Sequence, residues 1–270
     1  MASEASSSPK IKGAVVFDLM GTCTDWKSSI IACLHWQQPQ TTVDLPSLAT
    51  AWRAGFFKEI HRRFELGEPT EDIDVTHRRV LDGLLDDEGV GFSTWGEDIR
   101  QELVRGWHRQ SAWPDAIPGI ERLKQHYFVV VLANGSTRLQ MDIVKSTGLP
   151  FHSLFSSQLL NLTKPDPRMY LKAVELLDLH PSKCIMVAAH AYDLRAAAKV
   201  GMKTIYVQRA TEDLDEDMDR IRTEFDAFVD GTTDDSNSGL LGVAAILEKW
   251  CMKGDTDQSA VERTGGTVEY

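Results

Sequence analysis

A short apolar run that ends in a single carboxylate is the feature that most constrains the fold of this chain. Residues 13–17 read Gly-Ala-Val-Val-Phe, and Asp18 follows them shortly before a Gly21-Thr22 turn. An uninterrupted apolar run of this length is typical of a strand that is buried on both faces of a parallel sheet. Doubly wound α/β proteins place reactive groups at the carboxyl ends of such strands. We therefore predict an α/β fold with a doubly wound parallel sheet, and Asp18 is the candidate nucleophile.

Three further segments place polar side chains after predicted strands or in a turn. These side chains are Asn134 after residues 129–132, Lys164 and Tyr170 in the run Lys-Pro-Asp-Pro-Arg-Met-Tyr at 164–170, and His190 and Asp193 after residues 185–189. The carboxyl ends of parallel strands meet at one edge of a sheet. We therefore expect these side chains to lie near Asp18.

The four segments resemble, in order and spacing, the four motifs of the haloacid dehalogenase superfamily, and most closely its L-2-haloacid dehalogenase branch. The resemblance covers residues 13–208 and implies a Rossmann-like core, a covalent intermediate on Asp18, and an ion pair between Asp18 and Lys164. Ala133 departs from the serine that is usual in the second motif. Met20 stands where the phosphatases of the superfamily carry an acidic aspartate. Because a thioether cannot donate a proton to a leaving alcohol, this residue favours attack on carbon.

The resemblance also bears on metal binding. His190 stands where the phosphatases carry an aspartate that helps to hold magnesium, and the dehalogenases usually carry asparagine there. Magnesium prefers oxygen ligands in octahedral geometry, so the changes at Met20 and His190 disfavour a magnesium site. Lys164 instead offsets the charge of Asp18 and keeps it ionised. We predict no metal and no cofactor.

About a hundred residues separate the first two motifs, which is too long for a simple crossover connection. We expect a helical cap at residues 28–113, with helices near 45–66, 73–85 and 98–108, inserted into a core formed by residues 13–27 and 114–252. Residues 1–12 and 253–270 are polar and are predicted to be disordered. Trp52-Arg53 in the cap resembles the pair by which the dehalogenase branch holds the substrate carboxylate or the leaving group, and an arginine fork suits a carboxylate. Arg62 and Arg63 remain alternatives.

The predicted site follows from these motifs. The candidate catalytic residues are Asp18, Lys164, Asp193 and His190, and the candidate substrate-binding residues are Leu19, Met20, Thr22, Arg53, Asn134 and Tyr170. Asp18 attacks carbon, and Asp193 with His190 activates the water that hydrolyses the resulting ester. The expected substrate is a small 2-substituted carboxylic acid.

Two reactions fit this machinery. In 2-haloacid hydrolysis the halide leaves without a proton, whereas opening an epoxide requires an acid, which His190 or Tyr170 could supply. Residues 21–28, 134–137 and 188–194 resemble the cis-epoxysuccinate hydrolases that yield L-tartrate, a dehalogenase-like group. A phosphatase with an atypical metal site and a non-catalytic binding protein of the same fold remain alternatives.

Composition limits the partners. The formal charge of −11 disfavours nucleic acid, and no apolar run reaches the length of a membrane span. The first ten residues lack the apolar core of a signal peptide, so we expect a cytoplasmic protein with reduced cysteines. The acidic run at 212–219 is predicted to be a solvated loop or helix face. The family resemblance implies a homodimer.

Overall fold

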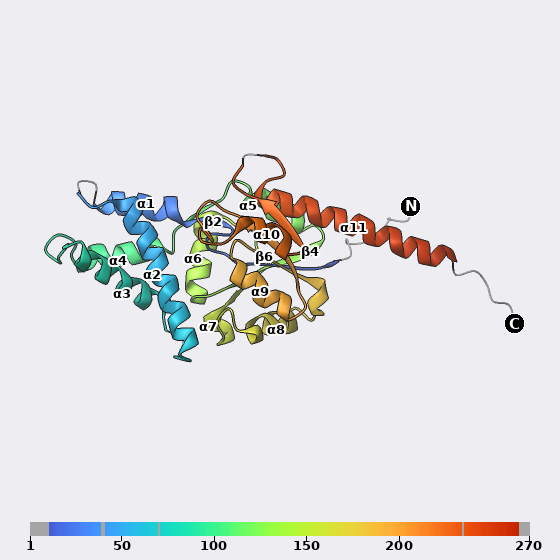
Figure 1. The fold of residues 1–270 in the computed structure, drawn as a ribbon, viewed down its shortest axis with the longest axis horizontal. Helices are drawn as coiled ribbons and strands as arrows, with labels where there is room; N and C mark the ends of the chain where they lie inside the picture. Colours follow the sequence, from blue (N-terminus) through green and yellow to red (C-terminus); the bar gives the residue numbers. More distant parts are fainter. Residues whose placement is uncertain (1–10, 39–40, 70, 234, 265–270) are drawn as a thin grey trace, which may run out of the picture.

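The computed structural model describes residues 11–38, 41–69, 71–233 and 235–264, and it is built around a six-stranded sheet. All neighbouring strands are parallel. In spatial order they are β5 (Ser153–Ser156), β4 (Tyr127–Ala133), β1 (Gly13–Phe17), β6 (Cys184–Ala188), β7 (Lys203–Gln208) and β8 (Ala227–Asp230). The predicted doubly wound α/β fold is therefore confirmed, and β1 lies in the middle of the sheet with β4 and β6 on its two sides (Figure 1).

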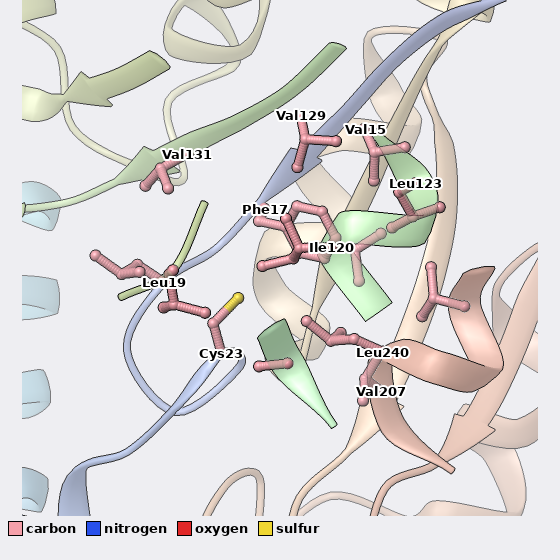
Figure 2. Close-up of a cluster of buried hydrophobic side chains, with 14 of the residues drawn as sticks. Val15, Phe17, Leu19, Cys23, Ile120, Leu123, Val129, Val131, Val207 and Leu240 are labelled. Carbon is pink, nitrogen blue, oxygen red and sulfur yellow. The ribbon is translucent and has the colours of Figure 1, made fainter. Parts of the chain in front are cut away.

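Both faces of the sheet are covered by helices. Alternate residues of β1 point to opposite faces, so Val15 and Phe17 belong to one hydrophobic cluster while Ala14 and Val16 belong to another. The first face is covered by α5 (Ala116–Leu123), α6 (Thr137–Thr147) and α11 (Gly239–Thr264), and the second by α8 (Pro167–Leu176), α9 (Ala191–Lys199) and α10 (Met218–Glu224). Figure 2 shows Phe17 against side chains that include Ile120. The short α7 (Ser157–Leu160) and η1 (Pro181–Lys183) lie in connections.

Four helices are inserted between the first and second strands of the main sheet. They are α1 (Trp26–Gln37), α2 (Leu45–Glu65), α3 (Ile73–Asp87) and α4 (Glu97–Gly106), and we call residues 26–106 the helical insert. The short strands β2 (Thr24–Asp25) and β3 (Ser111–Ala112) pair antiparallel at its base. The insert has its own buried cluster, which includes Trp26, Trp52 and Leu81. Helices α2 to α4 lie where the sequence predicts helices, whereas α1 was not expected.

The insert lies to one side of the sheet, next to the ends of the strands (Figure 1). No helix in the part of the chain that the structure describes is both long and apolar enough to cross a bilayer.

The C-terminal helix extends beyond the predicted end of the core. Helix α11 continues to Thr264, past residue 252 where the sequence places the end of the core. This segment contains good helix formers such as Gln258, Ala260 and Glu262 and no proline, so a helix that starts on the sheet can propagate through it. The expectations for residues 1–10 and 265–270 fall outside the described residues.

Candidate active site

The candidate nucleophile lies directly after the central strand. The amide of Asp18 donates to the Val187 carbonyl of β6 at 3.1 Å, which continues the β1 ladder by one residue. The chain then turns at Gly21, whose φ of +84° lies in the left-handed region that favours glycine. Because β4 and β6 flank β1, the loops that follow them deliver Asn134 and His190 to the same edge of the sheet.

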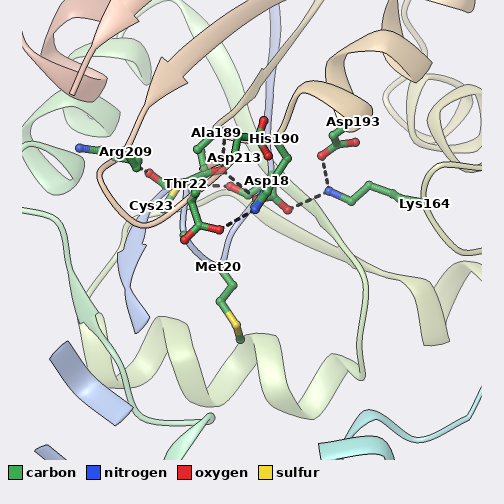
Figure 3. Close-up of polar contacts among 12 residues, drawn as sticks. Asp18, Met20, Thr22, Cys23, Lys164, Ala189, His190, Asp193, Arg209 and Asp213 are labelled. Carbon is green, nitrogen blue, oxygen red and sulfur yellow. Dashed lines mark hydrogen bonds and ion pairs between the residues drawn. The ribbon is translucent and has the colours of Figure 1, made fainter. Parts of the chain in front are cut away.

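Three donors surround the carboxylate of Asp18 (Figure 3). Lys164 Nζ lies 2.8 Å from Oδ1, while Thr22 Oγ1 and His190 Nδ1 lie 2.8 and 3.1 Å from Oδ2. Burial alone would raise the pKa of Asp18, but the charges and hydrogen bonds of Lys164 and His190 hold it well below its usual value. Asp18 is therefore an ionised carboxylate although its side chain is buried.

A chain of buried polar groups supports Lys164. Its ammonium group also pairs with Oδ2 of Asp193, and the other oxygen of Asp193 accepts from the Tyr170 hydroxyl. The main chain of Lys164 is fixed by Asn134, which accepts from its amide at 2.8 Å and donates to its carbonyl at 3.1 Å. Lys164 therefore lies between two carboxylates as a built-in cation.

His190 bridges two carboxylates. Its Nδ1 faces Asp18, and its Nε2 lies 2.7 Å from Oε2 of Glu212. Burial disfavours the charged ring, but the hydrogen bonds and charges of Asp18 and Glu212 outweigh it and raise the pKa of His190 to about 10. Both ring nitrogens therefore carry protons at neutral pH, and His190 is an imidazolium within hydrogen-bond distance of the Asp18 carboxylate.

The position of Glu212 corrects the prediction for the start of the acidic run, whereas Asp215, Asp217 and Asp219 are exposed as predicted. Glu212 is 5% exposed rather than solvated, and besides His190 it accepts from the indole of Trp26 and, at 2.8 Å, from the hydroxyl of Thr211. Asp213 likewise accepts from the amide of Ala191 at 2.6 Å. The sequence signal for these residues is their position just after β7, which is the neighbour of β6. Polar side chains that follow β7 reach the same edge of the sheet as those that follow β6.

A small cavity of about 50 Å³ lies between the strand ends and the helical insert. From the core it is lined by Asp18, Leu19, Met20, Asn134, Lys164 and His190. From the insert Arg53 enters it, with one guanidinium nitrogen 2.8 Å from the sulfur of Met20 and its charge stacked 4.3 Å from the centre of the Phe57 ring. This volume suits a ligand of only a few heavy atoms.

The alternative arginines lie elsewhere. Arg62 and Arg63 pair with the carboxylates of Glu59 and Glu68 and do not line the cavity. Arg53 is instead buried, and its nearest carboxylate, that of Glu212, is 3.9 Å away. The geometry therefore favours Arg53 as the cation that faces a ligand.

Three predicted site residues lie behind the cavity rather than on its wall. Thr22 and Tyr170 do not line the cavity, and their hydroxyls donate to Asp18 and Asp193. Asp193, which was expected to activate water, is fully buried, and both of its oxygens are engaged by Lys164 and Tyr170. Asp193 lies behind Lys164 and therefore positions that lysine. His190, in contrast, lines the cavity.

Comparison with known proteins agrees with this geometry. A family model described as "Hydrolase: haloacid dehalogenase-like hydrolase" matches residues 12–201. The chain belongs to this family. The (S)-2-haloacid dehalogenase 1 of Pseudomonas sp. (strain CBS-3) is 27% identical over 199 residues, covering 73% of this chain and 84% of that enzyme. The (S)-2-haloacid dehalogenase 4A of Burkholderia cepacia is 28% identical, with coverage of 73% and 83%.

Solved structures of haloacid dehalogenases are similar to this chain throughout the core and the insert. The L-2-haloacid dehalogenase PA0810 has a TM-score of 0.77 and 31% identity, covering 88% of this chain and 99% of that one. The defluorinating L-2-haloacid dehalogenase Rha0230 has a TM-score of 0.78 and 30% identity, with coverage of 87% and 95%. The protein is therefore a hydrolase of the haloacid dehalogenase family.

Proposed function

We propose that this hydrolase acts on a small 2-haloacid without a metal, through an ester of Asp18. The observation that carries the proposal is the ionised carboxylate of Asp18 at a cavity whose opposite wall presents Arg53. Arg53 holds the substrate carboxylate, and Asp18 faces the adjacent carbon. The dehalogenase names of the relatives and of the similar structures support the same substrate class.

In the first step an oxygen of Asp18 forms a bond to C2 of the substrate while the carbon–halogen bond breaks. The halide leaves with the electron pair and needs no proton, which fits a site where Met20 replaces an acidic residue. The product of this step is a neutral ester, so the negative charge of Asp18 is lost.

The second step is the attack of water on the ester carbonyl. Because Asp18 is one of the two anions that raise the pKa of His190, esterification makes the imidazolium a stronger acid. His190 then releases a proton to solvent, which accompanies the departed halide, and its neutral ring, paired with Glu212, accepts a proton from the attacking water. Collapse of the tetrahedral intermediate breaks the bond to the substrate oxygen, and His190 returns its proton to that oxygen to give the 2-hydroxy acid. The new carboxyl group of Asp18 then gives its proton to His190, which restores the ionised carboxylate and the imidazolium.

A second candidate reaction is the opening of an epoxide in a small acid such as cis-epoxysuccinate. The observation that favours it is the position of His190, whose Nδ1 lies 3.1 Å from Oδ2 of Asp18 and whose pKa is raised by its two carboxylate partners. As Asp18 attacks the epoxide carbon, His190 can protonate the oxygen that is released and become the neutral base for the next step. In this reaction, therefore, no net proton has to enter or leave the site.

The charge distribution disfavours a metal-dependent phosphatase. The Lys164 ammonium already pairs with Asp18 and Asp193, so these carboxylates have a cation of their own. Met20 supplies a thioether, which is a poor ligand for a hard cation such as magnesium. We therefore expect activity to persist in excess EDTA.

A single turnover in ¹⁸O-labelled water tests the ester. With enzyme in excess over (S)-2-chloropropionate, the label is expected in Asp18, because water attacks the ester carbonyl, and is read by mass spectrometry of the peptide that contains Asp18. Label in lactate with none in Asp18 means that water attacks carbon directly, which overturns the mechanism. An Asp18→Asn variant serves as the control and is expected to lose turnover.

A second assay separates the candidate substrates. Proton NMR follows (S)-2-chloropropionate and cis-epoxysuccinate together in EDTA, where lactate supports the first reaction and tartrate the second. If magnesium and a phosphate ester are required for any turnover, the protein is a phosphatase. Binding without turnover of any of these compounds indicates a non-catalytic member of the family.

A further inference from the structure

Unpaired polar atoms gather at the cavity. Among the described residues, seven buried side-chain nitrogen or oxygen atoms have no hydrogen-bond partner, and four of them belong to cavity-lining residues. These four are Nε of Arg53, both ring nitrogens of His77 and Oε1 of Gln140. Buried polar groups are nearly always paired, because leaving one unpaired costs free energy. A cluster of exceptions beside Asp18 therefore indicates groups that a ligand would pair.

His77 is held as a neutral hydrogen-bonding group. Its ring is stacked between Phe56, with centroids 4.0 Å apart, and Trp107, at 4.4 Å. Burial is the main reason that the pKa of His77 lies well below its usual value, and the nearby charge of Arg53 lowers it further. The ring therefore offers one N–H donor and one acceptor nitrogen at its edge, and neither has a protein partner.

Gln140 presents an acceptor in a fixed orientation. Its Nε2 donates to the carbonyls of Ala133 at 3.1 Å and Phe155 at 3.3 Å, which orients the amide. The remaining Oε1 is an acceptor without a donor. The apolar side chains of Leu139 and Ile143 line the same cavity. A ligand group that pairs with Gln140 must therefore supply a donor, whereas His77, which lines the same cavity, offers both a donor and an acceptor.

We propose that the substrate of the reaction proposed above carries a hydroxyl on the carbon next to the attacked one, and that this hydroxyl pairs with His77 and Gln140. A hydroxyl both donates and accepts, so it satisfies both residues with one atom. A second carboxylate would place its charge against the acceptor oxygen of Gln140 and beside a neutral imidazole. The pairing therefore selects a 2-halo-3-hydroxy acid over a dicarboxylic acid and over a simple alkyl haloacid.

A matched pair of substrates tests this inference. (S)-2-Chloro-3-hydroxypropionate and (S)-2-chlorobutyrate differ only in a hydroxyl against a methyl group. Chloride release is expected to give at least about a tenfold higher kcat/KM for the hydroxy acid, because the methyl group leaves His77 and Gln140 unpaired. In His77→Phe, which preserves the ring stack and removes both nitrogens, this ratio is expected to fall to about one.

A control variant separates the cavity from general effects on the insert. Trp95→Phe removes another buried nitrogen without a partner in the helical insert, but Trp95 does not line the cavity, so the preference is expected to remain. Equal kcat/KM values in the wild type overturn the inference. So does a His77→Phe variant that keeps the preference, because water rather than substrate would then satisfy the ring.

A binding measurement makes the test independent of turnover. Calorimetric titration with the corresponding products is expected to show glycerate binding about tenfold more tightly than 2-hydroxybutyrate, with the difference lost in His77→Phe. If neither chloroacid is hydrolysed but glycerate is preferred, the proposed reaction fails and the hydroxyl subsite stands. If both chloroacids are hydrolysed equally and both products bind equally, the reaction stands and the subsite is overturned.

Discussion

At the residue scale, two carboxylates decide the charge of His190. Asp18 and Glu212 each accept from one ring nitrogen, so the ring is protonated at a pH where histidine is usually neutral. In the proposed reaction, the residue that donates to Asp18 is thereby available as an acid or, after the charge of Asp18 is lost, as a base. Its partner Glu212 controls how readily it changes between these forms.

Replacing Glu212 by glutamine is expected to bring the pKa of His190 down from about 10 toward its usual value, because one of its two anionic partners becomes neutral. NMR titration of the labelled histidine rings measures this pKa. Glu216→Gln removes the same charge from the same acidic run, but Glu216 pairs with Arg195 and should leave His190 unchanged. An unaltered His190 titration in Glu212→Gln would contradict the assigned pairing.

His190 should also make stability depend on pH. Its pKa is raised from 6.5 in the unfolded chain to about 10 in the folded protein, so its contribution is fully present below pH 6.5 and is lost as the pH rises toward 10. We expect the free energy of unfolding to fall by a few kcal/mol, on the order of magnitude given by linkage, between pH 6.5 and 9.5. Denaturant titrations of the wild type and of His190→Asn measure it, and an equal pH dependence in both proteins would refute it.

At the scale of elements, the turn after β1 depends on the loop after β7. Gly21 has a positive φ, and a Cβ placed on it would lie 2.4 Å from the carboxyl carbon of Glu212. Glycine therefore allows the turn that follows Asp18 and the loop that contains Glu212 to approach each other closely. Neither segment can shift without moving a partner of Asp18 or His190.

Gly21→Ala is expected to destabilise the protein by about 2 kcal/mol or more, because the new methyl group meets both backbone strain and a buried carboxylate. The control is Gly83→Ala on helix α3, where no atom lies within 4 Å of the added methyl group. That change should stabilise the protein by about 0.5–1 kcal/mol, because alanine is the better helix former. Thermal and denaturant unfolding compare the two, and a neutral Gly21→Ala would show that the turn can rearrange.

At the scale of the whole molecule, a net charge of −11 opposes the approach of an anionic substrate. In the proposed reaction Arg53 must capture the substrate carboxylate against this field, because Lys164 and His190 are already paired with carboxylates. Salt screens interactions through solvent much more strongly than those between buried groups. The protein's long-range repulsion should therefore weaken with salt while the contacts in the cavity persist.

Raising the ionic strength from about 10 to about 150 mM is accordingly expected to lower KM for a monoanionic substrate by about twofold, with little change in kcat. Steady-state chloride release at several sodium sulfate concentrations measures the effect, since sulfate does not interfere with chloride detection. A KM that rises with salt would mean that exposed cations guide the substrate, contrary to the charge distribution described here.

Much of the fold could be predicted because its signals are local. Each buried strand is an apolar run followed by a polar turn, so β1, β4, β6 and β7 and the residues that follow them are visible in the chain itself. Helices α2 to α4 follow from apolar periodicity. Helix α1 was missed because its apolar residues are mixed with polar ones, and the end of α11 because polar composition alone does not exclude a helix.

The sequence by itself determined the identity and order of Asp18, Asn134, Lys164 and His190, because strand ends in a parallel sheet converge on one edge. Only the tertiary structure decided that Glu212 is buried against His190, that Tyr170 and Asp193 support Lys164, and that His77 and Gln140 line the cavity without partners. These facts depend on contacts between segments far apart in the chain. Burial and pairing are properties of such contacts, and no local pattern of residues encodes them.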